Sequence, residues 1–349
     1  CGLRAMRAVT VIPGVPESLK LRDVPKPRPG RGQVLLRPLM VGVCGTDKEI
    51  IEGKYGAAPE GSDYLILGHE ALAEVAELGD GVGNVSVGDL VVPTVRRPLN
   101  CDLPPDYCPP GRYLEHGIWG LHGHAAEYSV TDASYLVKVP KEIADVAVLM
   151  EPLSVVEKGV EIGIAAYQQR LGRRPEGALV LGAGPVGLLA AMVLRLMGIS
   201  VTAVATRPHD SLKARMVREI GGAYIDITHE GLSGTYDIVV EATGAPLMAL
   251  EGLKRLGPGG VEVLLGVYPS GGRVDDVGEL LTEAVLNDVV GSVNAGIKHF
   301  EAAARHLKEA KEMFGDWAKK LITKTAKLDN YHEAYSWTHD DIKTVLLIE

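Results

Sequence analysis

The chain has 349 residues, of which 46% are hydrophobic and 23% charged, and its formal net charge is -9 at pH 7. This length suggests about two domains, and the composition is ordinary for a globular enzyme. The negative net charge argues against a nucleic-acid partner, because phosphate backbones are bound by basic surfaces. The most apolar stretch, residues 178 to 199, contains glycines and Arg195, so we expect neither a membrane span nor a membrane partner.

The first residues lack the charged and then apolar pattern of a secretory signal, and we expect the protein to lie in the cytoplasm. We assign no function to residues 1 to 5. The cysteines are Cys1, Cys44, Cys101 and Cys108. Four cysteines are too few for a secreted disulfide scaffold, which favours metal binding or reactivity for them.

The N-terminal part of the chain predicts a domain made mainly of antiparallel strands. Apolar stretches separated by Gly and Pro turns indicate strands at residues 6–12, 34–43, 71–76, 126–130 and 136–139. Residues 93 to 123 are rich in Pro, Gly, Cys and His and lack periodicity, and a loop of this length is usually functional. Residues 146 to 169 then have helical spacing, which we expect Pro152 to interrupt.

From Ala178 onward the sequence alternates regularly between strand and helix patterns. We expect strands at residues 178–181, 199–205, 236–241, 260–266 and 288–293, and helices at residues 185–197, 210–220 and 246–256. Such a βαβ series predicts a parallel sheet, with 288–293 at its edge. A helix follows at 299–314, and we expect the last strand, 343–348, to return to the first domain.

A glycine-rich turn joins the first strand of this series to its helix. The turn has the form G-x-G-x-x-G and reads Gly182-Ala183-Gly184-Pro185-Val186-Gly187. Gly182 permits a tight turn, Gly184 lets the backbone approach a pyrophosphate, and Gly187 lets helix and strand pack closely. The helix that begins at Pro185 and Val186 offers unpaired N–H groups to phosphates. The motif alone is weak, but its position between strand and helix predicts a dinucleotide site.

The end of the next strand bears on the choice of dinucleotide. NAD sites usually place an acidic residue there to bind the ribose 2′-hydroxyl. Here the strand is followed by Thr206 and Arg207, and no acid occurs before Asp210. An arginine pairs with a 2′-phosphate, although it is also a common solvated loop residue. We therefore expect NADP in preference to NAD.

Cys44, His69 and Glu70 form a second constellation. Taken singly, each has an ordinary explanation: Cys44 as a small buried hydrophobe, His69 as a core histidine and Glu70 as a surface charge. Taken together, a thiolate, an imidazole and a carboxylate are suitable zinc ligands, and a catalytic zinc keeps one position open. Asp47 is placed to orient a ligand, although it also suits a helix N-terminus.

These features together resemble the zinc-containing medium-chain dehydrogenases over nearly the whole chain. The resemblance lies in Gly68-His69-Glu70, the spaced Gly79 and Gly88-Asp89, and the glycine-rich turn. Within that superfamily, three local features resemble the archaeal glucose dehydrogenases. They are Arg96-Arg97-Pro98, Glu115-His116-Gly117 with Gly120-Leu121-His122-Gly123, and Glu151-Pro152-Leu153-Ser154 with Glu157-Lys158.

The resemblance implies an α/β protein with a GroES-like, mainly antiparallel catalytic domain and a Rossmann domain with a doubly wound parallel sheet. We expect the catalytic zinc and substrate domain at residues 1–154 and 295–349, and the dinucleotide-binding domain at 155–294. The implied reaction is oxidation of D-glucose, or a related aldose such as galactose, at C1. Hydride passes to the nicotinamide of NADP, and a lactone results.

The resemblance also implies the residue roles. Cys44 and His69 would hold the zinc, and Glu70 and Glu151 would complete its shell directly or through water. Thr46 would hydrogen-bond the reacting hydroxyl and carry its proton outward, so we count Thr46, Glu70 and Asp47 as catalytic. Sugar hydroxyls would be bound by Thr46, Glu115, Glu151 and Asn294. The 2′-phosphate would be bound by Thr206 and Arg207, and the nicotinamide by Leu265, Gly266, Val267, Ser292, Val293 and Asn294.

The sequence departs from the superfamily pattern in two places. A structural zinc is often held there by four closely spaced cysteines, whereas this chain has only Cys101 and Cys108, with Asp102, Asp106 or His116 as further candidates. We therefore doubt a structural zinc, and a disulfide or two free thiols are the alternatives. Pro208 follows Arg207 where relatives tend to have a second arginine, so NAD stays an alternative cofactor.

Two other functions compete with the first. Another zinc dehydrogenase of the superfamily, acting on a polyol or L-threonine, would share the metal site but not Glu115 and Asn294. A catalytically idle protein that binds nucleotide would not need the metal ligands. The apolar strand 288–293 at the sheet edge invites pairing with a second copy, and the resemblance suggests a homodimer or homotetramer.

Overall fold

The structure is a computed structural model that describes residues 5–266, 268 and 277–348. Its contacts divide the chain into two compact units. Unit 1 comprises Cys1–Glu151, Asn294–Lys308 and Ala318–Glu349, and unit 2 comprises Pro152–Val293 and Glu309–Trp317. Val267, one of the expected cofactor residues, lies outside the described residues.

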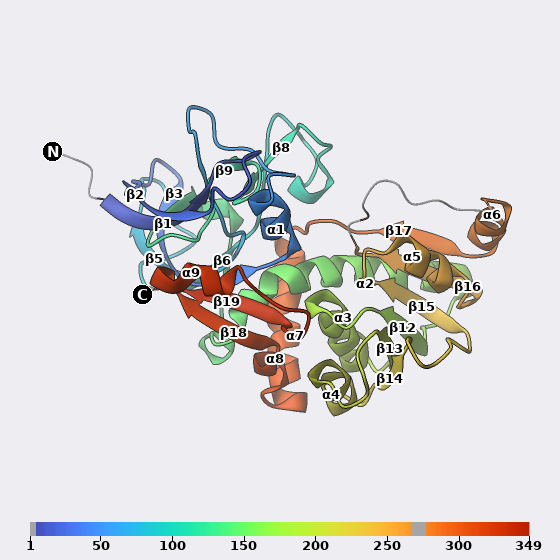
Figure 1. The fold of residues 1–349 in the computed structure, drawn as a ribbon. Helices are drawn as coiled ribbons and strands as arrows, with labels where there is room; N and C mark the ends of the chain where they lie inside the picture. Colours follow the sequence, from blue (N-terminus) through green and yellow to red (C-terminus); the bar gives the residue numbers. More distant parts are fainter. Residues whose placement is uncertain (1–4, 267, 269–276, 349) are drawn as a thin grey trace. The chain divides into compact units, whose positions relative to one another are not determined.

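Unit 1 consists mainly of antiparallel strands (Figure 1). Its largest sheet has the order β11-β6-β5-β3-β19-β18, and β10 also pairs with β3. These strands are β3 (Gln33–Val43), β5 (Glu70–Leu78), β6 (Leu90–Pro93), β10 (Ser129–Asp132), β11 (Leu136–Lys138), β18 (Ile322–Lys327) and β19 (Lys343–Leu347). The last strand, β19, pairs antiparallel with β3, so the C-terminus returns to the first part of the chain as expected.

Two smaller sheets complete unit 1. One has the order β2-β1-β4 and the other β7-β8-β9. Their strands are β1 (Ala5–Val11), β2 (Lys20–Pro25), β4 (Leu65–Ile66), β7 (Arg96–Pro98), β8 (Tyr113–His116) and β9 (Gly120–Leu121). The second sheet lies in the segment that we expected to be a loop. Its strands were not predicted because strands of two to four residues are too short to show an alternating pattern.

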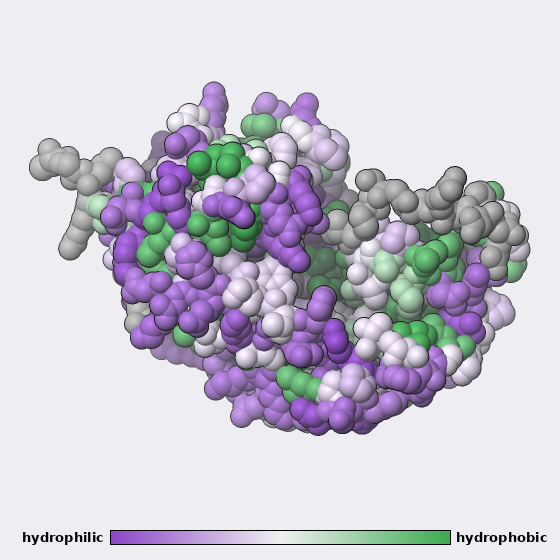
Figure 2. All heavy atoms as spheres, in the orientation of Figure 1, coloured by the Kyte–Doolittle hydropathy of each residue, from purple (hydrophilic) through white to green (hydrophobic). Residues whose placement is uncertain are grey.

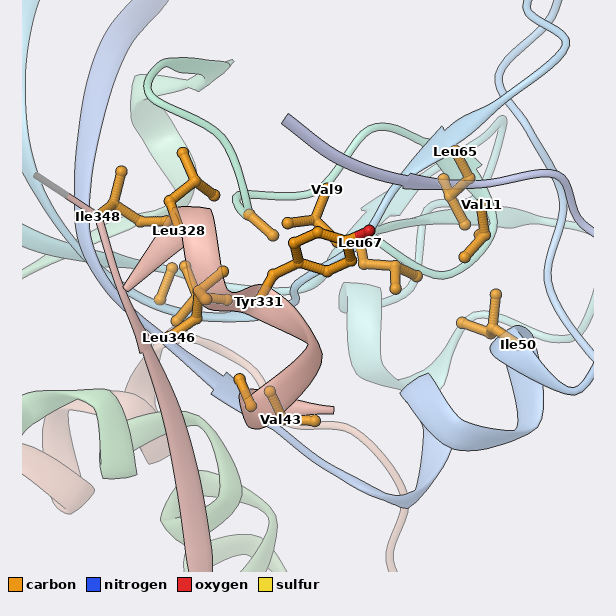
Figure 3. Close-up of a cluster of buried hydrophobic side chains, with 14 of the residues drawn as sticks. Val9, Val11, Val43, Ile50, Leu65, Leu67, Leu328, Tyr331, Leu346 and Ile348 are labelled. Carbon is orange, nitrogen blue, oxygen red and sulfur yellow. The ribbon is translucent and has the colours of Figure 1, made fainter. Parts of the chain in front are cut away.

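Short helices connect these strands. They are α1 (Gly45–Ile51), α8 (Trp317–Lys320), α9 (Tyr331–Ala334) and the 3₁₀ turns η1 (Pro105–Tyr107), η2 (Ala133–Tyr135), η3 (Lys141–Ile143), η4 (Ala147–Leu149) and η5 (Leu328–Asn330). Figure 3 shows the apolar cluster that α1 and α9 share with the strands. In it, Val43 directly precedes Cys44, Ile50 lies on α1, and Leu67 lies two residues before His69. The core therefore fixes the backbone on either side of the expected metal ligands.

Unit 2 contains a parallel sheet with the order β14-β13-β12-β15-β16-β17 (Figure 1). Its strands are β12 (Gly177–Leu181), β13 (Ser200–Ala205), β14 (Ala223–Asp226), β15 (Tyr236–Glu241), β16 (Leu256–Leu264) and β17 (Asp288–Gly291). The chain reverses direction along the sheet at β12, which is the arrangement of dinucleotide-binding folds. The predicted α/β class, with one antiparallel and one Rossmann part, is confirmed.

Helices cover this sheet. They are α2 (Met150–Leu171), α3 (Pro185–Leu196), α4 (Leu212–Glu219), α5 (Pro246–Leu253) and α6 (Val277–Leu286), and α7 (Ile297–Phe314) contributes residues to both units. In the first of them, Pro152 does not interrupt the helix as we expected. It lies in the first turn of α2, where backbone N–H groups have no partner within the helix.

Cys101 and Cys108 form a disulfide, with their Cα atoms 6.1 Å apart. This pairing resolves the alternatives left open for these cysteines, because bonded sulfurs are not available as thiolate ligands. Figure 2 shows that hydrophilic side chains cover much of the visible face of the molecule. Among the described residues, no helix combines the length and apolar composition needed to cross a membrane.

One carboxyl group in the parallel sheet is buried at an energetic cost. Glu262, in the middle of β16, has no exposed surface, and neither of its oxygens has a hydrogen-bond partner among the described residues. Burial, and after it the nearby Glu241 carboxylate, raises the pKa of Glu262 to about 9. Glu262 is therefore protonated in the folded protein at neutral pH.

We predict that Glu262→Gln stabilises the protein, and that the gain grows with pH. The unfolded chain loses the Glu262 proton above a pH of about 4.3, whereas the folded protein keeps it up to a pH of about 9. The wild-type free energy of unfolding therefore falls across this window, and the neutral amide removes that loss. Thermal unfolding at pH 5 and pH 8 measures it. An equal shift in Tm at both values would contradict the assignment.

Candidate functional site

The expected metal ligand Cys44 stands where β3 ends and α1 begins. It is the residue that precedes the first turn of α1, and its backbone N–H donates to Asp47 Oδ2 at 2.9 Å. This bond satisfies a backbone donor that the helix itself leaves unpaired, so it holds Asp47 against Cys44. Cys44 and Thr46 are half-buried, and Asp47 is fully buried.

The backbone before His69 is held by unusually close contacts. Gly68 has a φ of +93°, which favours glycine. A Cβ atom on Gly117 would lie 2.6 Å from the Gly68 carbonyl oxygen, and one on Gly123 would collide with the carbonyl oxygens of Leu67 and Gly68. The backbone N–H of His124 donates to the Gly68 carbonyl at 2.8 Å. The glycines of the 115–123 segment therefore let it pack directly on the turn that presents His69.

His69 lies between Cys44 and Asp47. Its Nε2 is 3.1 Å from Cys44 Sγ, and its Nδ1 is 3.8 Å from Asp47 Oδ1. Burial opposes a charge on His69, but the Cys44 sulfur and the Asp47 carboxylate outweigh it and hold the pKa of His69 well above its ordinary value. One ring nitrogen thus faces a sulfur, and the other lies near a carboxylate without a hydrogen bond between them. A carboxylate beside the second nitrogen is typical of metal-binding histidines.

Two further carboxylates lie close to His69. Glu70 begins β5 and Glu151 lies in the first turn of α2, and both are buried. One possible ligand atom from each of His69, Glu70 and Glu151 lies within 4.8 Å of the others, and the same holds for Cys44, Asp47 and His69. Burial, and after it the Glu70 carboxylate, raises the pKa of Glu151 to about 7.

Glu70 also forms a buried ion pair with Lys343 of β19. Lys343 is 2% exposed. Burial disfavours its charge, but the Glu70 carboxylate outweighs burial and keeps the pKa of Lys343 above its ordinary value. A Cβ atom on Gly42, opposite Glu70 in β3, would collide with the Glu70 carboxylate. Neither Lys343 nor Gly42 was predicted as a site residue from the sequence. A lysine within the apolar terminal strand was the only available signal.

These residues fit a divalent metal ion. Cys44, Asp47, Glu70 and Glu151 bring acidic groups around one imidazole, and Lys343 forms an ion pair with one of them, Glu70. Buried carboxylates are costly unless a positive charge accompanies them. A thiolate, an imidazole nitrogen and carboxylates form a ligand set that zinc accepts.

The other residues expected to bind substrate also lie in unit 1. Glu115 is 5% exposed, and its Oε1 accepts a hydrogen bond from Arg96 Nε at 2.9 Å. Asn294 is 9% exposed and has a φ of +55°, which asparagine tolerates better than most residues. Its Oδ1 accepts from the backbone N–H of Ala295 at 3.0 Å. Of these two residues, Glu115 has a buried ion-pair partner, Arg96, that the sequence did not reveal.

The glycine-rich turn in unit 2 has the geometry expected of a nucleotide site. Gly182 has a φ of +105°, and a Cβ atom on Gly187 would collide with the Gly182 carbonyl oxygen. Gly184 precedes the first turn of α3, with Pro185 and Val186 next, and a Cβ atom on Gly184 would meet no atom within 4 Å. Open space above Gly184, in front of unpaired N–H groups, is what a pyrophosphate requires.

The loop after β13 has more positive charge than the sequence analysis recognised. Thr206 is exposed and Arg207 is half-buried, and the Arg207 carbonyl accepts from Tyr224 OH at 2.7 Å. From α4, Arg218 NH1 donates to the His209 carbonyl at 2.7 Å, and Arg215 donates to the Asp210 carbonyl. Arg215 and Arg218 lie about one helical turn apart, which was the signal available for finding them.

The expected nicotinamide residues follow the neighbouring strands β16 and β17. The backbone N–H of Leu265 donates to the Glu241 carbonyl at 2.9 Å, and Ser292 Oγ donates to the Val155 carbonyl at 3.3 Å. Gly266 is packed against Gly244, and 61% of Val293 is exposed. The structure thus brings these residues to the carboxyl ends of the parallel strands, where the glycine-rich turn also lies.

Glu241, at the end of β15, is a residue that the sequence analysis missed. It has no exposed surface and accepts hydrogen bonds from the backbone N–H of Thr243 at 2.7 Å and from Tyr268 OH at 2.5 Å. These bonds fix the loop that contains Thr243. The loop lies against the glycine-rich turn, because a Cβ atom on Gly182 would be 3.1 Å from Thr243 Cγ2. The signal in the sequence for Glu241 was an acidic residue at the end of an apolar strand.

Comparisons with known proteins agree along the whole chain. Residues 144–348 match the family model described as Glucose dehydrogenase C-terminus, and residues 30–141 match the Alcohol dehydrogenase GroES-like domain. The chain is 73% identical over 346 residues to a glucose 1-dehydrogenase of Thermoproteus tenax, covering 99% of this chain and 100% of that protein. It is 69% identical over 345 residues to a glucose 1-dehydrogenase of Caldivirga maquilingensis, covering 98% and 99%.

Among solved structures, the fold matches the Haloferax mediterranei glucose dehydrogenase in complex with NADP, Zn and gluconolactone. The TM-score is 0.90 and the sequence identity 33%, and the match covers 99% of both chains.

We predict that Lys343→Met lowers the free energy of unfolding of the metal-free protein by about 3 kcal/mol, because it leaves the buried Glu70 carboxylate without its counter-charge. Chemical denaturation after treatment with a chelator measures the change. Lys48→Met is the matched control, since it removes an exposed lysine 3.9 Å from Glu52 and should change stability by less than about 0.5 kcal/mol. Equal losses in the two variants would show that the buried ion pair contributes nothing particular.

Proposed function

This chain belongs to the glucose dehydrogenase family, and we propose that it oxidises D-glucose, and related aldoses such as galactose, at C1 to the aldonolactone with NADP as the hydride acceptor. The observation that carries the proposal is the buried cluster around His69, in a chain that is 73% identical to a glucose 1-dehydrogenase. The reaction removes the C1 hydroxyl proton and the C1 hydride, and the residues of this chain account for both requirements.

Zinc is held by Cys44 and His69, and Glu70 and Glu151 complete its surroundings directly or through water. When bound, the metal supplies Lewis acidity that lowers the pKa of the C1 hydroxyl. Asp47 orients the His69 ring through Nδ1, which is 3.8 Å from its Oδ1. The Lys343 ammonium holds the Glu70 side chain through a buried ion pair.

Thr46 moves the proton. Its Oγ1 lies in the first turn of α1, two residues after Cys44, and the side chain is half-buried. A hydroxyl can accept one hydrogen bond while donating another, so Thr46 takes the C1 hydroxyl proton and passes it toward solvent. Glu115, Asn294 and Glu151 bind the other sugar hydroxyls and hold C1 in the reacting position.

NADP is bound by unit 2. The pyrophosphate lies on the backbone of Gly182, Gly184 and Gly187 at the N-terminus of α3, where Pro185 and Val186 begin the helix. Thr206 and Arg207 bind the 2′-phosphate, and Arg215 and Arg218 add positive charge nearby. The nicotinamide is bound by Leu265, Gly266, Val267, Ser292, Val293 and Asn294. NAD is the weaker alternative.

We also propose that the enzyme is a homodimer or homotetramer in the cytoplasm. β17 is an edge strand of the parallel sheet, and 43% of its Val289 is exposed. Leu281, Val285 and Leu286 of the preceding helix are more than half exposed. Apolar side chains beside an open strand edge favour pairing with a second copy of the chain. A dissociable cofactor is recycled by other enzymes of the same compartment, which favours the cytoplasm.

A substrate panel tests the function. We expect turnover of D-glucose with NADP, slower turnover with NAD, and little with polyols or L-threonine. A chelator should abolish activity and zinc should restore it. Metal analysis should find that Cys44→Ser with His69→Ala loses the zinc, whereas Cys101→Ser with Cys108→Ser retains it. Turnover of a polyol without turnover of any aldose would overturn the proposal.

Replacing Arg207 by Ala tests the cofactor assignment. The KM for NADP should rise about tenfold or more, because a charge-assisted contact to the 2′-phosphate is lost. The KM for NAD should change little, since NAD has no phosphate at this position. Initial rates with each cofactor at saturating glucose measure both values, and an equal rise for the two would exclude a role in 2′-phosphate binding.

A further inference from the structure

Two exposed aromatic side chains of unit 1, Tyr55 and Trp119, lie beside each other. Their ring centroids are 5.6 Å apart, the planes are tilted by 41°, and 40% of Tyr55 and 43% of Trp119 is exposed. Single exposed apolar side chains are common on proteins. This pair is different, because the backbone joins two distant segments to make it: Ala57 N–H donates to the Ile118 carbonyl at 3.1 Å, and Gly120 N–H donates to the Ala57 carbonyl at 2.9 Å.

Trp119 closes a tight turn that begins at Glu115. The backbone N–H of Glu115 donates to the Trp119 carbonyl at 2.8 Å, and that of Trp119 donates to the Glu115 carbonyl at 2.9 Å. The Glu115 carboxylate is ion-paired to Arg96, whose guanidinium lies 3.7 Å from the centroid of the Tyr113 ring. Burial, and after it the charge of Glu115, raises the pKa of the Tyr55 phenol. The Tyr55 phenol therefore lies within electrostatic range of the Glu115 carboxylate, and the backbone bonds place Trp119 in the same turn as Glu115.

The same turn is packed against the metal cluster. Gly117, at its centre, comes so close to the Gly68 carbonyl that a Cβ atom would lie 2.6 Å away, and Gly68 directly precedes His69. Gly56, next to Tyr55, lies against Ile50 of α1, where its Cβ atom would be 3.2 Å from that side chain. The aromatic pair is thus fixed to the two segments that carry His69 and Cys44.

A pyranose ring has a particular chemical shape. In glucose the ring hydroxyls point outward from the ring edge, and the C–H groups form two flat apolar faces. A site for such a ring needs hydrogen-bond acceptors for the edge and a flat apolar surface for a face. Glu115 is an acceptor, and Tyr55 and Trp119 are the exposed flat surfaces that the backbone ties to it.

We propose that Tyr55 and Trp119 form a platform on which one face of the pyranose ring stacks while Glu115 binds its hydroxyls. The proposal rests on the function above and adds to it the two residues that select a cyclic sugar over an open-chain alcohol. The platform contacts the ring equally in the ground state and in the transition state, so it contributes to KM and not to kcat.

Trp119→Leu and Tyr55→Leu test the platform. Each should raise the KM for glucose about tenfold, corresponding to the loss of one aromatic contact, with kcat within about twofold of wild type. Trp119→Phe and Tyr55→Phe keep a ring and should each raise KM less than the leucine variant at the same position. Val87→Ala, which truncates a side chain of the same unit that is 62% exposed, is the control and should leave both constants unchanged. A wild-type KM in both leucine variants would overturn the proposal.

Binding without turnover provides a separate measurement. Adding gluconolactone should change the tryptophan fluorescence of wild type, because Trp119 is exposed, whereas Trp317 is fully buried and Trp337 is half-buried. The change should be lost in Trp119→Phe and kept in Trp337→Phe, while bound zinc, measured by metal analysis, stays at the wild-type level in both. Failure of wild type to oxidise any aldose would refute the proposed function itself. A leucine variant that changes the oligomeric state in light scattering, with an unaltered KM, would show instead that the pair contacts a second copy.

Discussion

The structure of unit 1 depends on how it balances buried charge around His69. Asp47, Glu70 and Glu151 are acidic groups removed from water, and an unpaired buried carboxylate is costly. The last strand of the chain returns to pair with β3, and its Lys343 supplies an ammonium to Glu70. The path of the C-terminus is therefore part of the electrostatics of the cluster, and a metal ion held there would supply further positive charge.

Close backbone packing fixes the positions of the groups around His69. Gly42 leaves room for the Glu70 side chain beside β3, and Gly117 lets the 115–119 turn touch the Gly68 carbonyl. A side chain at Gly42 would collide with Glu70, and one at Gly117 would displace the backbone just before His69. The turn that carries Glu115 and the turn that presents His69 are thereby in direct contact, so Glu115 keeps a defined position relative to the cluster around His69.

Local patterns in the sequence predicted much of what is local in the structure. The strands β12, β13, β15, β16 and β17 were expected from neighbouring residues and are confirmed, whereas β14 and α6 were not predicted. The expected return of the last strand to the first part of the chain is also confirmed. Lys343 and the Arg96–Glu115 ion pair depend on segments that only the fold brings together, so no spacing revealed them. β7, β8 and β9 were not predicted because their pairing, and not their side-chain pattern, makes them strands.

The disulfide provides the stabilisation that a structural zinc often provides in such proteins. Cys101–Cys108 closes a loop of the segment that includes η1, next to the strands carrying Arg96 and Glu115. A covalent bond stabilises this segment by restricting the unfolded chain, whatever metal is present, whereas a structural zinc would make its folding depend on the metal. The segment that packs beside Arg96 and Glu115 is therefore held by a covalent bond, and its stability does not require a second metal ion.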